Sequence, residues 1–192
     1  MKAKTKKLLS LVIMMCVILA SIAPVQTQAA KADGSKKNPY SAYKSCKTDV
    51  YGASYAGEFK IKLVDYKDGK DALKFLKENG VKKNPGKSKE YVYLKFKIKC
   101  LSADEEVPAD LILNDYWSFF DSKCKKQLKT EVIPVDDGNK ELSYNTMISP
   151  GETVVCSIAL SVKSGSTPIT YRISAGYDKN YNEIEKWFTT KK

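Results

Sequence analysis

The chain has 192 residues, with 33 Lys and Arg against 22 Asp and Glu, a formal net charge of +11, and no histidine. Without histidine, Ser–His and Cys–His nucleophile pairs are excluded, and the commonest general base is missing. Arg172 is the single arginine beside 32 lysines. This composition disfavours sequence-specific nucleic acid binding, because base readout relies on the bidentate arginine fork.

Residues 1–30 have the order of a secretory signal peptide. Four lysines precede an apolar run from Leu8 to Ala23, and Pro24 and a stretch of small residues follow. The apolar run is shorter than the roughly 20 residues that a membrane-spanning helix needs. We expect cleavage near Ala30, with Ala29 and Ala32 as alternative sites. The expected product is an exported protein, extracellular or loosely associated with the cell wall, with no transmembrane segment after signal removal.

The charge of the exported chain is unevenly distributed. Residues 31–192 carry 29 basic and 22 acidic residues, a net charge of +7. The net charge is +10 over residues 31–100 and −3 over residues 101–192. Residues 31–45 are polar, basic and rich in Gly, Ser and Pro, and we interpret them as a flexible leader before a single domain over residues 46–192.

Two long segments in the first half of this domain alternate in polarity with the period of a β-strand. In the predicted strand over residues 55–66, apolar Phe59, Ile61 and Leu63 alternate with lysines. In residues 90–100, EYVYLKFKIKC, one face is apolar from Val92 to Cys100 and the other carries tyrosines and lysines. Between them, residues 71–79 are predicted to form a helix that Asp71 caps and Gly80 ends.

The second half contains more short apolar runs, separated by turn signals at residues 136–139 and at Pro150-Gly151. The predicted strands span 109–113, 116–121, 127–135, 142–148, 152–162, 169–175 and 183–189. Eight or nine short strands with turn signals every 8–12 residues indicate an all-β antiparallel sandwich with one short inserted helix.

Four blocks of the sequence carry a resemblance to a known family. In order, they are EFKIKLVDYKDG, YVYLKFKIKC, YWSFFDSKCKKQL and ISPGETVVCSIALSV. The chain resembles secreted immunoglobulin-like domains of unknown function from Gram-positive bacteria, which are similar in fold to a small mycobacterial immunoprotective antigen and to telokin. It departs from that pattern at Cys156, where a small residue is expected, and in its inserted helix. The resemblance implies an immunoglobulin-like sandwich outside the cell and no catalytic residues.

Cys46, Cys100, Cys124 and Cys156 remain after signal removal. Four cysteines in an exported protein predict two disulfides, with three possible connectivities. In an immunoglobulin-like layout the strands over 90–100 and 152–162 are antiparallel neighbours, which favours Cys100–Cys156 and leaves Cys46–Cys124. A Cys46–Cys100 bridge is the alternative. Zinc is disfavoured because there is no C-x₂-C pair and no histidine.

Candidate acid–base and metal groups all lie in polar, turn-like stretches. The acidic groups are Asp104, Glu105 and Glu106, and Asp136 with Asp137. Residues 136–139 lack the longer ligand string of a calcium loop, so a hairpin turn is the favoured interpretation. We therefore expect no metal site and no cofactor.

Two outward surfaces are candidates for binding. One is a basic face of Lys60, Lys62, Lys95, Lys97 and Lys99, provided that the two long strands pair. Its alternative role is to keep the sheet soluble and its edges protected. The other is an aromatic patch of Tyr91, Tyr93, Tyr116 and Phe120, unless a loop or the leader covers it. Trp117 and Phe119 are expected in the core.

The favoured functional hypothesis is a secreted, non-enzymatic module that binds a protein or an anionic cell-envelope component such as a wall polymer. The alternative is an extracellular enzyme that uses carboxylates or lysine without histidine. A structural spacer is a third possibility, for which the sequence offers no internal repeat.

Overall fold

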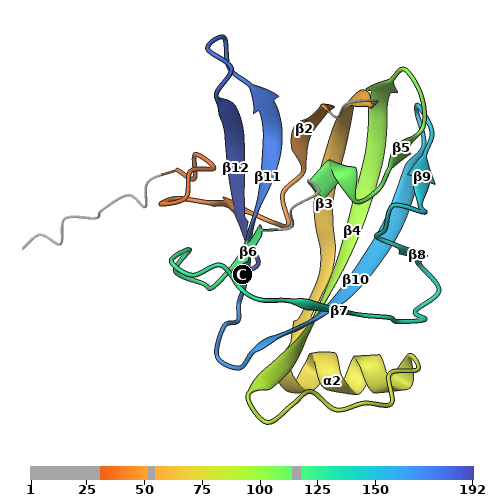
Figure 1. The fold of residues 1–192 in the computed structure, drawn as a ribbon, viewed down its shortest axis with the longest axis vertical. Helices are drawn as coiled ribbons and strands as arrows, with labels where there is room; N and C mark the ends of the chain where they lie inside the picture. The colour runs from red at the N-terminus through yellow and green to blue at the C-terminus, as the bar shows by residue number, and fades with distance from the viewer. Residues whose placement is uncertain (1–30, 52–54, 114–117) are drawn as a thin grey trace, which may run out of the picture. The chain divides into compact units, whose positions relative to one another are not determined.

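Strands from both halves of the chain pair into two main sheets that pack as a β-sandwich (Figure 1). The computed structural model describes residues 31–51, 55–113 and 118–192, so the predicted signal peptide lies outside the described residues. Within these ranges the chain is mostly strand, with one α-helix, α2 (Gly69–Glu78), and one 3₁₀ turn at Leu111–Leu113. The predicted all-β sandwich with a short inserted helix is therefore confirmed.

The larger sheet contains the long strands. Its order is β2 (Cys46–Tyr51), β3 (Ala56–Asp68), β4 (Lys89–Ala103), β10 (Thr153–Lys163) and β7 (Glu131–Ile133), with β8 (Lys140–Glu141) also pairing with β10. The smaller sheet has the order β1 (Tyr40–Ser41), β12 (Glu183–Thr189), β11 (Thr170–Tyr177) and β6 (Ser118–Phe120). A separate pair joins β5 (Val107–Pro108) to β9 (Met147–Ile148).

This connectivity follows the immunoglobulin arrangement, in which one sheet has the order A-B-E-D and the other C-F-G. Strands β3, β4, β10 and β7 take the places of A, B, E and D, and β6, β11 and β12 take those of C, F and G. The predicted antiparallel pairing of the strands over 90–100 and 152–162 is present as β4 with β10.

The alternating apolar residues of the two sheets meet in one core. Phe96 of β4 is fully buried and meets Tyr171 of β11 edge to face, with ring centroids 5.7 Å apart. Tyr171 in turn stacks on Phe188 of β12 at 5.4 Å. Such aromatic pairs add roughly 0.5–1.5 kcal/mol to the free energy of burial. This aromatic cluster ties the two sheets together at their centre.

Helix α2 follows β3 directly and lies across one end of the larger sheet (Figure 1). It begins at Gly69, two residues earlier than predicted, and no side chain caps it. Gly80 lies just beyond its end with a φ of +90°, a left-handed conformation that glycine adopts at little cost. Ala72 and Leu76 are fully buried against the outer side of the sheet, so the helix makes a second, smaller core.

The predicted leader over residues 31–45 is instead part of the sandwich. Tyr40 and Ser41 form β1, which pairs in parallel with the last strand. Upstream, the backbone N–H of Trp187 donates a 2.8 Å hydrogen bond to the Gly34 carbonyl. At Gly34 a Cβ would lie 2.2 Å from the Tyr40 ring, so only glycine fits there. The folded unit therefore begins at Ala32 and not at residue 46.

Several short predicted strands are wrong or shortened. The run over 109–113 ends in a 3₁₀ turn, and only residues 131–133 of the segment 127–135 form a strand. Of the segment 142–148, only Met147 and Ile148 are strand. By contrast, the strand over residues 183–189 is found as predicted. The unpredicted β2 adds an outer strand beside β3.

The predicted disulfide arrangement is not found, and all four cysteines are free thiols. The β4–β10 register places Cys156 opposite Phe96, while the Cys100 N–H bonds to Glu152. The offset of four residues separates the two cysteines by roughly 13 Å along the strands, beyond the ~4.4–6.8 Å between Cα atoms that a disulfide needs. A Cys100–Cys156 bridge is therefore wrong for this register.

Neither the predicted Cys46–Cys124 bridge nor the alternative Cys46–Cys100 bridge is found. Cys46 lies in β2 opposite Ile61, so β3 separates it from Cys100. Cys124 packs with Phe120 and Trp187 at the smaller sheet. Burial raises the pKa of the Cys156 thiol to about 11, which leaves it protonated and unreactive at neutral pH.

Candidate functional site

The lysines of β3 and β4 form one basic face on the outer side of the larger sheet. Lys60 lies directly opposite Lys99 in the antiparallel register. Two residues along, Lys62 lies directly opposite Lys97. Directly opposed side chains are about 5 Å apart at Cβ, and successive outward residues are about 7 Å apart along a strand. The structure thus brings together four of the five predicted lysines in a compact rectangle.

The flanking positions do little to neutralise this rectangle. On β10, Thr153 lies opposite Lys99 and the half-buried Val155 opposite Lys97. On β2, Lys47 lies opposite Lys60 and forms its own ion pair with Glu58 at 2.7 Å. Among the described residues, the four lysines of the rectangle are exposed and form no ion pair. Their charges face solvent.

The fifth predicted lysine, Lys95, marks the boundary of the face. It is half-buried and lies opposite Asp65. A β-bulge between Leu63 and Asp65 inserts one extra residue into β3 there, which shifts the strand's alternation by one position. Beyond the bulge an acid follows the lysines on the outward side. The basic face is therefore Lys60, Lys62, Lys97 and Lys99, with Lys95 at its edge.

The predicted aromatic patch is wrong. Tyr91 and Tyr93 do lie on the outer side of β4, but they are only 2% and 1% exposed because α2 covers them. Phe120 lies in the smaller sheet, buried against Trp187 at a ring distance of 4.7 Å. Tyr116 and Trp117 lie outside the described residues. Phe119 is buried in the core as predicted.

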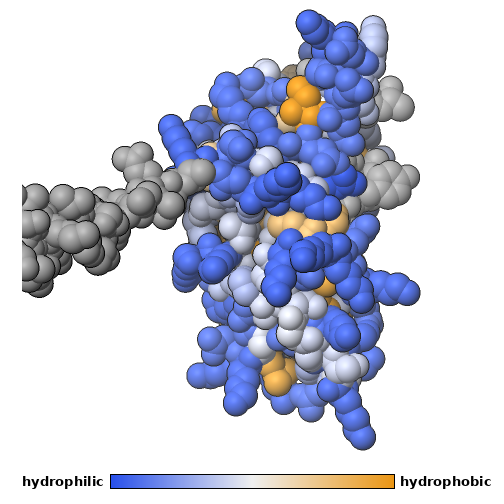
Figure 2. Space-filling view, turned by 90° about the vertical axis from the view of Figure 1, so that its left-hand side faces the viewer, coloured by the Kyte–Doolittle hydropathy of each residue, from blue (hydrophilic) through white to orange (hydrophobic). Residues whose placement is uncertain are grey.

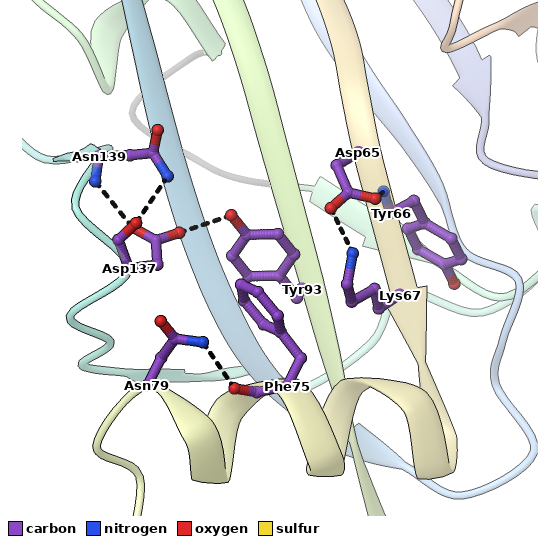
Figure 3. Close-up of polar contacts among 8 residues, drawn as sticks. All are labelled: Asp65, Tyr66, Lys67, Phe75, Asn79, Tyr93, Asp137 and Asn139. Atoms are coloured by element: carbon purple, nitrogen blue, oxygen red, sulfur yellow. Dashed lines mark hydrogen bonds and ion pairs between the residues drawn. The ribbon is translucent and has the colours of Figure 1, made fainter.

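A hydrogen-bonded network around Asp137 closes the helix-covered end of the same sheet (Figure 3). The Tyr93 hydroxyl donates to Asp137 Oδ2 at 2.5 Å. The other carboxylate oxygen accepts from the Ser157 hydroxyl and from the Asn139 N–H, both at 3.0 Å. Phe75 of α2 lies against the Tyr93 ring at 4.5 Å. Asp137 thus joins the turn over residues 136–139 to β4 and β10.

The network changes the proton affinity of its members. Burial opposes ionisation of Asp137, but the hydrogen bonds from Tyr93, Asn139 and Ser157 together outweigh it and lower its pKa. Burial, reinforced by the adjacent carboxylate, raises the pKa of Tyr93. Both oxygens of Asp137 are used as acceptors within the fold. This carboxylate is therefore a structural anion and not a free acid–base group.

We expect Asp137→Asn to lower the free energy of unfolding by about 1–3 kcal/mol at pH 7, because the amide presents a donor where buried hydroxyls need an acceptor. The folded pKa is lowered, so the stabilisation is present above the unfolded value of about 3.9 and is lost as pH falls through the folded pKa. Urea unfolding from pH 3 to pH 8 measures this.

Asp136→Asn is the matched control, since Asp136 is exposed and surface changes of this kind stay within about 0.5 kcal/mol. An equal loss in both variants, or a gap between wild type and Asp137→Asn that widens below pH 4, contradicts the assignment.

The other candidate carboxylates are dispersed on the surface. Asp104, Glu105 and Glu106 are exposed, and Glu106 accepts a 2.7 Å hydrogen bond from the Ser149 hydroxyl. Within the described part of the chain, no three Cys, Asp or Glu side chains converge as metal ligands. Nor does any helix there have the length and apolar character needed to cross a membrane.

Comparison with known proteins gives no family. No family model matches the chain, and no curated protein matches it. Two solved structures are similar. One is a candidate lipoprotein from Staphylococcus aureus subsp. aureus NCTC 8325, with a TM-score of 0.43 and 12% identity over 76% of this chain and 94% of that one. The other is an uncharacterized β-sandwich protein from Clostridium difficile 630, with a TM-score of 0.41 and 13% identity over 84% and 100%. These scores are too low to carry any conclusion about function.

Proposed function

We propose that this chain is an exported binding module whose basic face, Lys60, Lys62, Lys97 and Lys99, binds an anionic polymer of the cell envelope. The observation that carries the proposal is the cross-strand pairing of like charges, Lys60 with Lys99 and Lys62 with Lys97. Like charges directly opposite each other destabilise a sheet. Solubility alone needs only scattered lysines, so this arrangement favours a role in attracting anions.

The chemistry of the face fits a diffuse polyanion better than a shaped ligand. Lysine ammonium groups are flexible point charges that need no fixed acceptor geometry. The face is part of a sheet, so an extended polymer can lie along it and contact several lysines at once. The sole arginine, Arg172, is engaged in an ion pair with Glu185 and does not belong to the face.

Salt release of the wild-type protein from isolated cell envelopes tests the proposal. Attraction between exposed charges acts over about 10 Å at 0.1 M salt but only about 3 Å at 1 M. We expect binding at low salt and complete release well below 1 M NaCl. Envelopes stripped of their anionic polymer should retain no protein, and vesicles of zwitterionic phospholipid, which carry no net charge, should not bind it either. Binding that resists salt, or that survives removal of the polymer, contradicts the proposal.

A further inference from the structure

A second group of lysines lines an open pocket beside the smaller sheet, formed by two segments that are far apart in the sequence. Lys36 and Lys37 come from the segment before β1, and Lys123 and Lys125 from the turn after β6. The pocket has a volume of about 560 Å³, and Ser122 and Cys124 also line it. No acidic residue is among the lining residues.

The fold holds both segments in place. Pairing of β1 with β12 and the bond from Trp187 to Gly34 fix the first segment. Lys36 Nζ then lies 5.2 Å from the centroid of the Trp187 ring and 5.6 Å from that of Phe120. Contacts of this kind are favourable cation–π interactions. Lys36 is therefore positioned by the rings of Trp187 and Phe120.

The second segment is a tight turn organised by Asp121. Its Oδ1 accepts the backbone N–H of Lys125 at 2.9 Å, and the Cys124 N–H bonds to its carbonyl. The backbone N–H of Lys125, with those of Lys126 and Lys123, holds the pKa of the Asp121 carboxyl below its ordinary value. Cys124 has a φ of 54° and packs inward, while Lys123 and Lys125 on either side are exposed. The turn thus presents two ammonium groups to the pocket.

The charge of this pocket contrasts with that of another surface pocket. A pocket of about 450 Å³ between the ends of β2, β3 and β4 is lined by Asp49, Glu58 and Asp104. Figure 2 views the molecule from the side on which residues 32–45 and β12 lie in Figure 1, and that side is mainly hydrophilic with only separate hydrophobic spots. A charged ligand therefore suits this side better than an apolar one.

We propose that this pocket binds a compact phosphate-bearing anion, such as a short chain of linked phosphates. Lysine is a common phosphate ligand that acts as a point charge, and four lysines match a group with several negative charges. Among the described residues these four lysines form no ion pair. The pocket is open to solvent and has a volume of about 560 Å³, so a short chain of phosphates has room beside the four lysines. The site uses none of the basic-face residues and does not rest on that function.

Trp187 provides the readout, because an anion that draws Lys36 toward the pocket changes the charge above the indole ring. The chain has two tryptophans, so Trp117→Phe leaves Trp187 as the only tryptophan, and its emission is excited at wavelengths that the tyrosines do not absorb. We expect titration of this protein with tripolyphosphate to give a saturable change in emission. Sodium chloride at equal ionic strength should give none.

Lys123→Gln combined with Lys125→Gln should weaken tripolyphosphate binding about 10- to 100-fold, since each charge-assisted contact is worth about a factor of ten. Lys36, whose Nζ lies over the Trp187 ring, is retained in this variant, so the reporter pair is unchanged. Lys60→Gln combined with Lys99→Gln is the matched control and should bind as the parent does. No saturable change, or an equal loss in both double variants, overturns the pocket site. If the protein does not bind envelopes but still shows the saturable fluorescence response, the basic-face proposal is contradicted and the pocket site is supported.

Discussion

Replacing Phe96 with Ala should lower the free energy of unfolding by about 3–5 kcal/mol, the range for removing a buried aromatic side chain. Phe96 is fully buried at the centre of β4, between Leu63 of β3 and Cys156 of β10. Its ring also meets Tyr171 of the opposite sheet. Small domains have only about 5–15 kcal/mol of stability in total, so this one change removes a large part of it.

Phe75→Ala is the matched control. Phe75 is half-buried and packs against Tyr93 outside the main core, so its loss should be clearly smaller. Denaturant unfolding measured by circular dichroism gives both values. If Phe96→Ala does not fold, Phe96→Leu replaces it in the comparison with Phe75→Ala, because leucine fills part of the space of the phenylalanine ring. A loss for Phe96→Ala no larger than that for Phe75→Ala would show that the contact between the sheets is not central to stability.

The sequence predicts the long strands well because each has enough residues to show a period of two. The alternation from Val92 to Cys100 and the strand over residues 152–162 both place their apolar faces correctly in the core. Strands of two or three residues, such as β1, β5 and β9, offer no such pattern. Their pairing is set by the surrounding tertiary structure.

Register is harder to predict, and the cysteines show why. Alternation determines which face a residue occupies, but it cannot distinguish slips of two or four residues, since these keep every side chain on the same face. Cys100 and Cys156 both point inward, as predicted, yet they are offset by four residues in the β4–β10 register. The predicted bridge had the correct strands and faces and the wrong register.

In the candidate site, too, features that depend on neighbouring residues could be predicted from the sequence, and features that depend on tertiary contacts could not. The lysine rectangle follows from alternation and from pairing of consecutive strands, and both are local. Whether Tyr91 and Tyr93 are exposed or buried depends on α2, whose apolar side packs against them. The bulge in β3 that ends the basic face breaks the alternation without leaving a glycine or proline as a sign.

Replacing Lys60, Lys62, Lys97 and Lys99 together with Gln should weaken envelope binding by about 10²- to 10³-fold. Each lysine near an anionic surface is worth about 1 kcal/mol, so four are worth about 4 kcal/mol, and each 1.4 kcal/mol is a factor of ten. The free energy of unfolding should stay the same or rise, because the two opposed lysine pairs no longer repel each other. Binding therefore falls while the free energy of unfolding does not, which loss of folding cannot produce.

The matched control replaces four scattered, exposed lysines with Gln: Lys129, Lys163, Lys179 and Lys191. Both variants lose the same net charge, so only the local concentration of charge on the sheet differs between them. We expect the control to bind within a few-fold of wild type in a sedimentation assay at 50 mM NaCl. Equal weakening in the two variants would mean that binding follows net charge, and the paired lysines would then have no special role.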